Sequence, residues 1–188
     1  MSAVRRIVRD EDAQGIMELV IAIAVINVAI LAMFAMFQAG ALSVLRASRT
    51  SNGAVVAEKQ AELYRAMLYK DIQLNGSLVT SAASDSLHIA ASEWGSSSLQ
   101  VNSSSCTNTL PECQPVQTSV TGADGRAYRV DTYIQAVTPS SGRAGKQVTV
   151  VVRLASNTSR TLAKLTSNYD LATGCTTDSA AATAARCT

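Results

Sequence analysis

The sequence predicts an α+β protein in which a long N-terminal transmembrane and stalk helix precedes a small antiparallel β-meander domain. Two observations predict this fold class. The first is an unbroken apolar run of membrane-spanning length at residues 19–37, LVIAIAVINVAILAMFAMF, beyond which the helical pattern continues. The second is a change after residue 75 to Ser, Thr and Asn mixed with alternating apolar residues. At 188 residues with 4% aromatic residues, the chain has room for one small globular domain.

Residues 1–15 form a short hydrophilic leader whose charges sum to zero. Its basic residues come first and its acidic residues follow: Arg5, Arg6, Arg9, then Asp10, Glu11 and Asp12. Because basic residues that precede an apolar span tend to stay in the cytoplasm, we expect the N-terminus inside and the rest of the chain across the membrane.

Residues 16–45 are expected to be the transmembrane half of the helix. The apolar run of nineteen residues would rise roughly 28 Å, close to the thickness of the hydrocarbon core. Asn27 is its one polar residue, and no charge stands between Glu18 and Arg46. A segment that is apolar all round needs lipid or other helices around it. The alternatives are a core helix of a globular protein and a secretory signal cut near residues 39–41.

Glu18 stands at the edge of the apolar run, where a carboxylate is costly unless something compensates it. One interpretation places it at the level of the lipid headgroups, stabilised by the N-terminal end of the helix dipole. The other makes it half of a salt bridge that forms only when helices bundle, so that the charge sets the register of an assembly.

Residues 46–74 are expected to form an amphipathic stalk half of the same helix, with the helical signal reaching Lys70. Apolar residues recur there every three or four positions and predict one stripe that packs on a small domain: Ala54, Val56, Ala57, Ala61, Leu63, Tyr64, Met67 and Leu68. Glu62 and Arg65 can pair across one turn. Asn52-Gly53 is a plausible place for a bend, because glycine costs about 1 kcal/mol in a helix interior.

Residues 75–188 are expected to form the extracytoplasmic β-rich domain. Three runs, at residues 126–137, 146–154 and 160–165, show partial or clear alternation and predict an antiparallel meander. The apolar face of the second run is predicted to lie on the upper half of the helix. Short edge strands are expected at residues 86–91 and 98–101 of the Ser-rich segment 77–121.

Four cysteines follow the helix, all on the expected outer side. The expected connectivity pairs each cysteine with its nearest neighbour in sequence, Cys106 with Cys113 and Cys175 with Cys187, because these pairs close the shortest loops. Such disulfides belong in an oxidising compartment. Neither pair has the close spacing of a zinc knuckle, so no metal site is expected.

Composition and motifs argue against an enzyme and against nucleic acid as a direct partner. A net charge of +2 provides no basic field for a phosphate backbone. Ser84, Asp85 and His88 supply the residue types of a hydrolase triad, but no nucleophile elbow accompanies them, and chance explains the cluster. No phosphate-binding glycine loop is present, and no cofactor is expected.

The start of the chain resembles the class III signal of type IV pilins and type II secretion pseudopilins. The matching residues are Gln14-Gly15-Ile16-Met17-Glu18-Leu19-Val20-Ile21-Ala22. The resemblance implies a pilin-like fold, a cut by a membrane peptidase after Gly15, and methylation of the new amine on Ile16. Family members usually place glutamate fifth in the mature chain, whereas this cut places Glu18 third; a cut after Ala13, leaving Gln14 first, restores the spacing.

Two functions remain open. The favoured one is a structural, minor subunit of a type IV pilus or type II secretion-like pseudopilus, in which Glu18 meets the amine of Ile16 on an adjacent subunit. Its expected partners are other subunits, the prepilin peptidase and methyltransferase, an inner-membrane assembly platform and membrane lipid. The chain would pass once through the cytoplasmic membrane and then enter an envelope or surface filament. The alternative is a signal-anchored envelope protein whose outer domain binds a ligand or protein.

Overall fold

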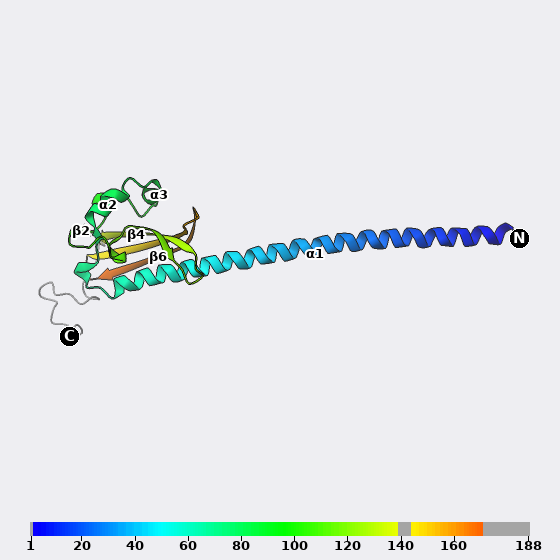
Figure 1. Ribbon diagram of the computed structural model, residues 1–188, viewed down its shortest axis with the longest axis horizontal. Coiled ribbons are helices and arrows are strands. Elements are labelled where there is room, and N and C mark those ends of the chain that lie inside the picture. Colours follow the sequence, from blue (N-terminus) through cyan, green and yellow to red (C-terminus); the bar gives the residue numbers. More distant parts are fainter. Residues whose placement is uncertain (1, 139–143, 171–188) are drawn as a thin grey trace. The chain divides into compact units, whose positions relative to one another are not determined.

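The computed structural model describes residues 2–138 and 144–170. Two compact units divide the chain, residues 1–48 and residues 49 onward, and helix α1 (Ser2–Arg65) contributes to both (Figure 1). The long apolar helix followed by a small antiparallel sheet of four strands is the α+β layout that the sequence predicts.

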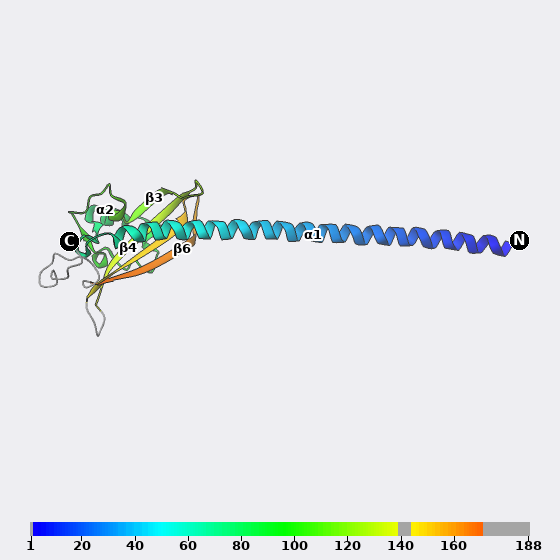
Figure 2. The ribbon, with the colours of Figure 1, turned by 90° about the horizontal axis from the view of Figure 1, so that it is seen from below.

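The first unit consists of α1 alone, drawn in blue in Figure 2. Every residue from 15 to 48 is exposed, including the large apolar side chains. Nothing in the described chain therefore covers this part of the helix, although its composition is that of a buried segment.

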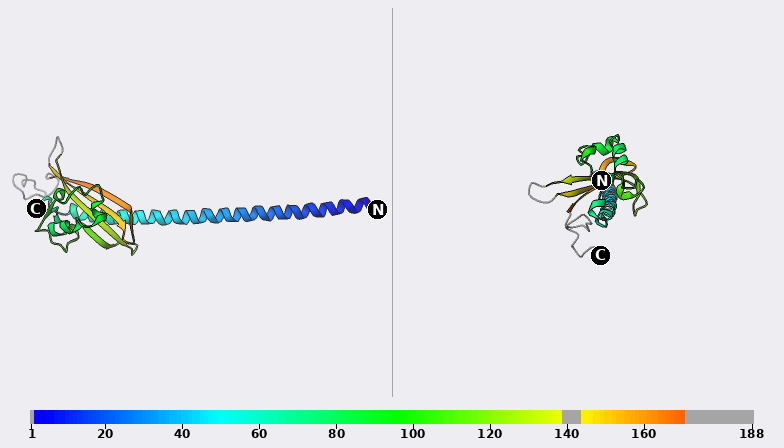
Figure 3. Two further views of the ribbon diagram at one scale, coloured as in Figure 1. Left: turned by 90° about the horizontal axis from the view of Figure 1, so that it is seen from above. Right: turned by 90° about the vertical axis from the view of Figure 1, so that its left-hand side faces the viewer.

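The second unit is built on a sheet whose strands follow one another in chain order, β3-β4-β5-β6 (Figure 3). These strands are β3 (Val116–Thr121), β4 (Ala127–Val137), β5 (Gly145–Leu154) and β6 (Asn157–Asp170), and all neighbours are antiparallel. The three predicted strands are confirmed as β4, β5 and β6. The first two boundaries agree within one residue, β6 is longer than predicted, and β3 was not predicted.

The register separates the residues of the sheet onto two faces. Val130 of β4 lies opposite Val152 of β5, and Thr132 lies opposite Val150, so these residues share one face. That face belongs to the buried apolar cluster that includes Tyr64 of α1. Arg129, Asp131 and Tyr133 alternate with them and occupy the opposite face.

The second half of α1 supplies the apolar stripe that the sequence predicts. Val56, Ala57, Ala61 and Tyr64 are buried within the second unit, at intervals of one, three and four residues. The helix ends at Arg65, before the predicted Lys70, and Arg65 forms the expected ion pair with Glu62.

The helix continues without interruption through Asn52 and Gly53, where a bend was expected. Gly53 has a packing role instead. A Cβ atom built on it would lie 2.9 Å from the Cβ of Leu162 on β6. Glycine here allows the backbone of the helix to approach the last strand closely, which offsets its cost in helix propensity.

Between α1 and β3 lies a segment of short elements. In order these are η1 (Tyr69–Asp71), β1 (Leu74–Asn75), α2 (Gly76–Ala82), α3 (Ser86–Ile89), η2 (Ser97–Leu99), β2 (Asn102–Ser103) and η3 (Pro111–Cys113). β1 and β2 pair in parallel as a separate small sheet.

The predicted edge strands at residues 86–91 and 98–101 are wrong. The first region forms α3, because the carboxylate of Asp85 accepts hydrogen bonds from the amides of Leu87 and His88 and caps a helix. In the second region, Ser98 and Leu99 lie in the 3₁₀ turn η2, and Gln100 forms only an isolated antiparallel bridge with Gln135 of β4. Asn75 caps α2 in the same way as Asp85 caps α3, through the amide of Leu78 at 3.0 Å.

Candidate functional site

The residues expected to be processed and to assemble lie close together on α1. Gly15, Ile16 and Glu18 are exposed, and the rise from Gly15 to Glu18 is roughly 4.5 Å, less than one turn. A Cβ atom on Gly15 would meet nothing within 4 Å. The alternative cut, between Ala13 and Gln14, lies in the same helix, before the residues whose side chains are described.

The apolar segment that follows Glu18 is one candidate membrane span. Among the described residues, α1 from Gly15 to Arg65 is the one helix long and apolar enough to cross a bilayer. Its large side chains are open, with Leu31 70% and Phe37 76% exposed. A contiguous apolar surface of this size on a protein marks contact with lipid or with other proteins.

Glu18 meets no opposite charge among the side chains that the structure describes. A carboxylate at the edge of a membrane span is costly unless water, headgroups or an opposite charge compensates it. Compensation for Glu18 must therefore come from outside the described chain.

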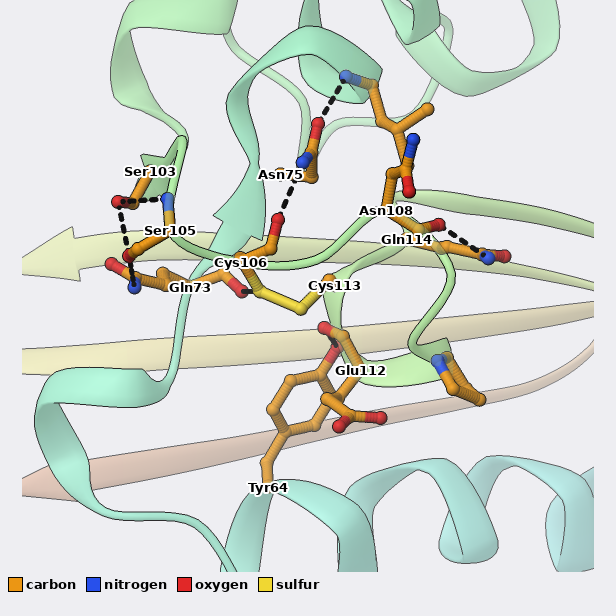
Figure 4. The surroundings of a disulfide bond; sticks show 12 residues. Tyr64, Gln73, Asn75, Ser103, Ser105, Cys106, Asn108, Glu112, Cys113 and Gln114 are labelled. Atoms are coloured by element: carbon orange, nitrogen blue, oxygen red, sulfur yellow. Dashed lines mark hydrogen bonds between the residues drawn. A yellow bond between two sulfur atoms is a disulfide. The ribbon is translucent and has the colours of Figure 1, made fainter.

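Cys106 and Cys113 form a disulfide, with Cα atoms 5.6 Å apart (Figure 4). Several hydrogen bonds attach the closed loop to the rest of the second unit, among them two from Gln60 and Gln117 to the carbonyl of Pro111. The side-chain amide of Asn75 donates to the carbonyl of Cys106 at 2.6 Å, and the hydroxyl of Tyr64 donates to the carbonyl of Glu112 at 2.7 Å. The expected Cys175–Cys187 pair lies outside the described residues.

A second constellation lies on the sheet face opposite α1, at the carboxylate of Asp131. Asp131 is fully buried and accepts hydrogen bonds from Arg129 at 2.8 Å, Arg153 at 2.6 Å and the Nδ1 of His88 at 3.1 Å. Arg129 also donates to Asp85 at 2.8 Å. These five residues, called the Asp131 cluster below, join α3 to β4 and β5.

The electrostatics of the Asp131 cluster are balanced. Burial alone would raise the pKa of Asp131, but hydrogen bonds from His88 and Arg129 and the charge of Arg129 outweigh it and hold that pKa below its usual range. The pKa of Asp85 is also lowered, since its bonds to Arg129 and to the α3 amides outweigh its desolvation. Two guanidinium groups and two carboxylates together carry no net charge.

The ring of His88 is enclosed by aromatic side chains. It stacks on Tyr133 with centroids 4.4 Å apart and meets Trp94 edge-on at 5.0 Å. Its Nε2 is buried without a hydrogen-bond partner. The hydroxyl of Ser84 donates to the carbonyl of Ser81 instead of contacting His88. A Ser84 nucleophile activated by His88 is therefore not assembled in this geometry.

A cavity of about 470 Å³ opens where α1 ends beside the end of β6. Its described lining includes Tyr64, Arg65 and Tyr69 from one side and Tyr169 and Asp170 from the other. Burial raises the pKa values of Tyr69 and Tyr169. The side chains mix aromatic surface with both signs of charge, a lining suited to a small polar ligand or a peptide.

Sequence reasoning missed the Asp131 cluster. The alternation of residues 126–137 predicts that Arg129, Asp131 and Tyr133 share one face of a strand, but an acidic residue beside an arginine is typical of a solvated face. One signal for burial of this face is present in the run RVDTYI, because the face that carries Arg129 and Asp131 also carries Tyr133. Only the register with β5 brings Arg153 to the same carboxylate.

Among the described residues, no group of three or more histidine, cysteine, aspartate or glutamate side chains could hold a metal ion. Comparison of the chain with protein-family models, with curated proteins and with solved structures gives no significant match. Functional inference therefore depends on the sequence pattern and the geometry described above.

Proposed function

We propose that this protein is a minor subunit of a type IV pilus or of a type II secretion-like pseudopilus. In this proposal a prepilin peptidase removes the leader on the cytoplasmic side of the membrane, and the new N-terminal amine is methylated. The apolar half of α1 first anchors the subunit in the cytoplasmic membrane and then joins a helical filament core on an inner-membrane assembly platform.

One observation carries the proposal: residues 15–48 form an unbroken helix with every side chain exposed. An ordinary anchor of nineteen apolar residues is satisfied by lipid, and a filament core is satisfied by neighbouring copies of the same kind of helix. The carboxylate of Glu18 at the start of the segment favours the second environment, since only bundled helices can bring the opposite charge of a neighbouring subunit to it.

The second unit supports the proposal by its independence from the first. It covers its own half of α1 with the β3-β4-β5-β6 sheet and a buried apolar cluster. The first unit contributes no residue to that buried cluster. A subunit of this kind can move from lipid into a filament without refolding its outer domain.

The proposed assembly contact is a salt bridge between Glu18 and the amine of Ile16 on the adjacent subunit. Cleavage after Gly15 creates that amine, so processing and assembly are chemically linked. Before cleavage the nitrogen of Ile16 is an uncharged amide and cannot compensate a carboxylate.

Mass spectrometry of the mature N-terminus tests the proposal. The chain is purified from the membranes of cells that contain the assembly system, and its first residue is read. A methylated Ile16 is expected, and a methylated Gln14 would move the cut to the alternative site. Recovery with Met1 intact, or a cut near residues 39–41, would contradict the proposal.

A matched pair of variants sharpens this experiment. Gly15→Leu places a bulky residue before the proposed cut and is expected to leave the leader attached. Gly40→Leu makes the same change further along α1, where a Cβ atom also meets nothing within 4 Å, and should leave processing intact. If both variants are processed equally, the cut does not follow Gly15.

The cavity beside Tyr69 and Tyr169 favours a second candidate, a signal-anchored envelope protein with a binding domain. This candidate requires no leader removal and no role for Glu18 in assembly. Retention of Met1 in the membrane-bound chain, together with normal membrane fractionation, would select it over the filament subunit.

A further inference from the structure

Asn27 places an amide in the middle of the apolar half of α1. It lies nine residues after Glu18, roughly 13 Å further along the helix, and no charged residue follows it until Arg46. The helix is regular on both sides of Asn27, and the side chain is exposed in the described structure.

An exposed amide at this depth has hydrogen-bonding groups that hydrocarbon cannot satisfy. The side chain carries two N–H donors and one carbonyl acceptor, while α1 already uses its own backbone groups. Burial of such a group without a partner is costly, and in membranes asparagine finds partners on neighbouring helices. The partner must lie at the same depth as Asn27.

We propose that two copies of this chain pair in parallel within the membrane through Asn27. The amide is self-complementary, because the N–H of one copy can donate to the carbonyl of the other in both directions. Two copies of one sequence also insert with the same orientation and place this residue at the same depth. A second copy of the chain therefore supplies both a complementary amide and the same depth in the membrane.

The residues above and below Asn27 on the helix provide the remainder of a two-helix seam. Positions three, four and seven residues apart in a heptad share its face: Val20 (58% exposed), Ile23 (51%), Ile30 (51%) and Phe34 (64%). In parallel two-stranded coiled coils, apolar a and d positions interrupted by one asparagine at an a position define the register and favour two helices. Because the whole run is apolar, Asn27 alone fixes the register, and it places these four residues at the a and d positions around it.

The pairing does not depend on the proposed filament function. It concerns subunits in a bilayer, where neither leader removal nor an assembly platform is needed. A processed subunit and a simple envelope anchor would both carry it. Its failure would therefore leave the filament proposal untouched, and the reverse also holds.

Energy transfer in vesicles tests the pairing. The purified full chain, labelled at an N-terminal tag with either a donor or an acceptor dye, is reconstituted into phosphatidylcholine vesicles. Asn27→Leu should weaken self-association about 5- to 30-fold, and Asn27→Gln, which keeps the amide, should retain most of it. Val25→Leu, roughly 160° around the helix from Asn27, is the matched control and should change nothing.

Cysteine cross-linking locates the seam independently of affinity. Phe34→Cys lies roughly 20° from Asn27 around the helix, whereas Val25→Cys lies on the far side. Oxidation of each variant in vesicles should give dimers for Phe34→Cys and few for Val25→Cys. Equal cross-linking of the two, a wild-type chain that stays monomeric, or unchanged association of Asn27→Leu would each overturn the proposal.

Discussion

The two halves of α1 have the same secondary structure and opposite relations to their surroundings. Residues 49–65 bury a stripe that includes Ala57, Ala61 and Tyr64 under the sheet of their own chain. Residues 15–48 bury nothing, and within them the run 19–37 is apolar on every side apart from Asn27. A helix with one apolar stripe packs that stripe against its own chain. A helix that is apolar all round needs lipid or other protein molecules to bury its surface.

The carboxylates of the two units differ in the same way. Asp131 is buried and receives hydrogen bonds from Arg129, Arg153 and His88, so the fold itself neutralises it. Glu18 has no such neighbours among the described side chains. One charge contributes to the stability of a domain, and the other is available for an intermolecular contact.

Asp131→Ala is expected to have the largest effect on folding. It leaves Arg129 and Arg153 buried without their shared acceptor, which should lower the free energy of unfolding by about 3–5 kcal/mol. Trp94 is the single tryptophan and is buried in the second unit, so its fluorescence during urea unfolding of the full chain reports this domain. Glu58→Ala, at an exposed position on α1, is the control and should change stability by less than about 1 kcal/mol.

Acid titration checks the same cluster without a mutation. The folded pKa of Asp131 is depressed, so its contribution to stability is complete above the unfolded-state pKa of about 3.9 and is lost as pH falls through the folded value. Wild-type stability should therefore drop below about pH 4. The part of that drop that comes from Asp131 should be missing in Asp131→Ala. If the free energy of unfolding of the two proteins falls with the same slope against pH, Asp131 does not contribute to the drop.

Glu18→Ala should break assembly while leaving the domain folded. Removal of one member of a buried ion pair leaves the other charge uncompensated, so incorporation into filaments should fall at least about tenfold. Filaments are sheared from cells, and the subunit is measured in the sheared and membrane fractions. The variant should still fractionate with membranes and unfold at the wild-type urea concentration. Equal incorporation of both proteins would favour the signal-anchored alternative.

Removal of the Cys106–Cys113 bridge should destabilise the second unit alone. The two residues are seven apart, and closing so short a loop in the unfolded chain is worth about 2.5 kcal/mol in the chain-entropy description. A double Cys106→Ser, Cys113→Ser variant should show this loss in the urea transition of Trp94. Its membrane fractionation should match wild type, and a weaker membrane association would mean that the two units are not independent.

A pair of glycine substitutions gives the smallest effect and compares the two halves of α1 directly. Gly53→Leu forces a side chain against Leu162 and should cost about 1–3 kcal/mol in domain stability. Gly40→Leu meets open space and should leave the unfolding of the domain unchanged. Similar losses for the two variants would show that the close approach at Gly53 does not limit the packing.

The elements that the sequence predicts well are those with a period visible in one stretch of chain. The apolar run, the stripe ending near Tyr64 and the β4 and β5 strands all carry such a period. The strand β3, VQTSVT, was missed because its residues are mostly polar and it lies at the edge of the sheet. Helix α3 could not be predicted in the same way, because its four residues are too few to show a helical period and the capping residue Asp85 is also common in turns.

The Asp131 cluster lies beyond this kind of prediction. Its members come from three elements. Arg153 reaches Asp131, twenty-two residues away in sequence, only because β4 pairs with β5. No local pattern states which of two strand faces an inserted segment such as α3 will cover. The residues proposed for processing and assembly are the opposite case, because Gly15, Ile16 and Glu18 lie within four consecutive positions of the chain.

The hydrogen bond from the hydroxyl of Tyr169 to the carbonyl of Ala61 joins residues 108 positions apart. Ribosomes add about 5–20 residues per second, so the stripe on α1 emerges roughly 5–20 s before the strand that covers it. During that interval Val56 and Tyr64 are as exposed to solvent as residues 15–48 of the same helix. The nascent chain therefore exposes the apolar residues of both halves of α1, and the later synthesis of β6 removes those of the second unit from contact with other molecules.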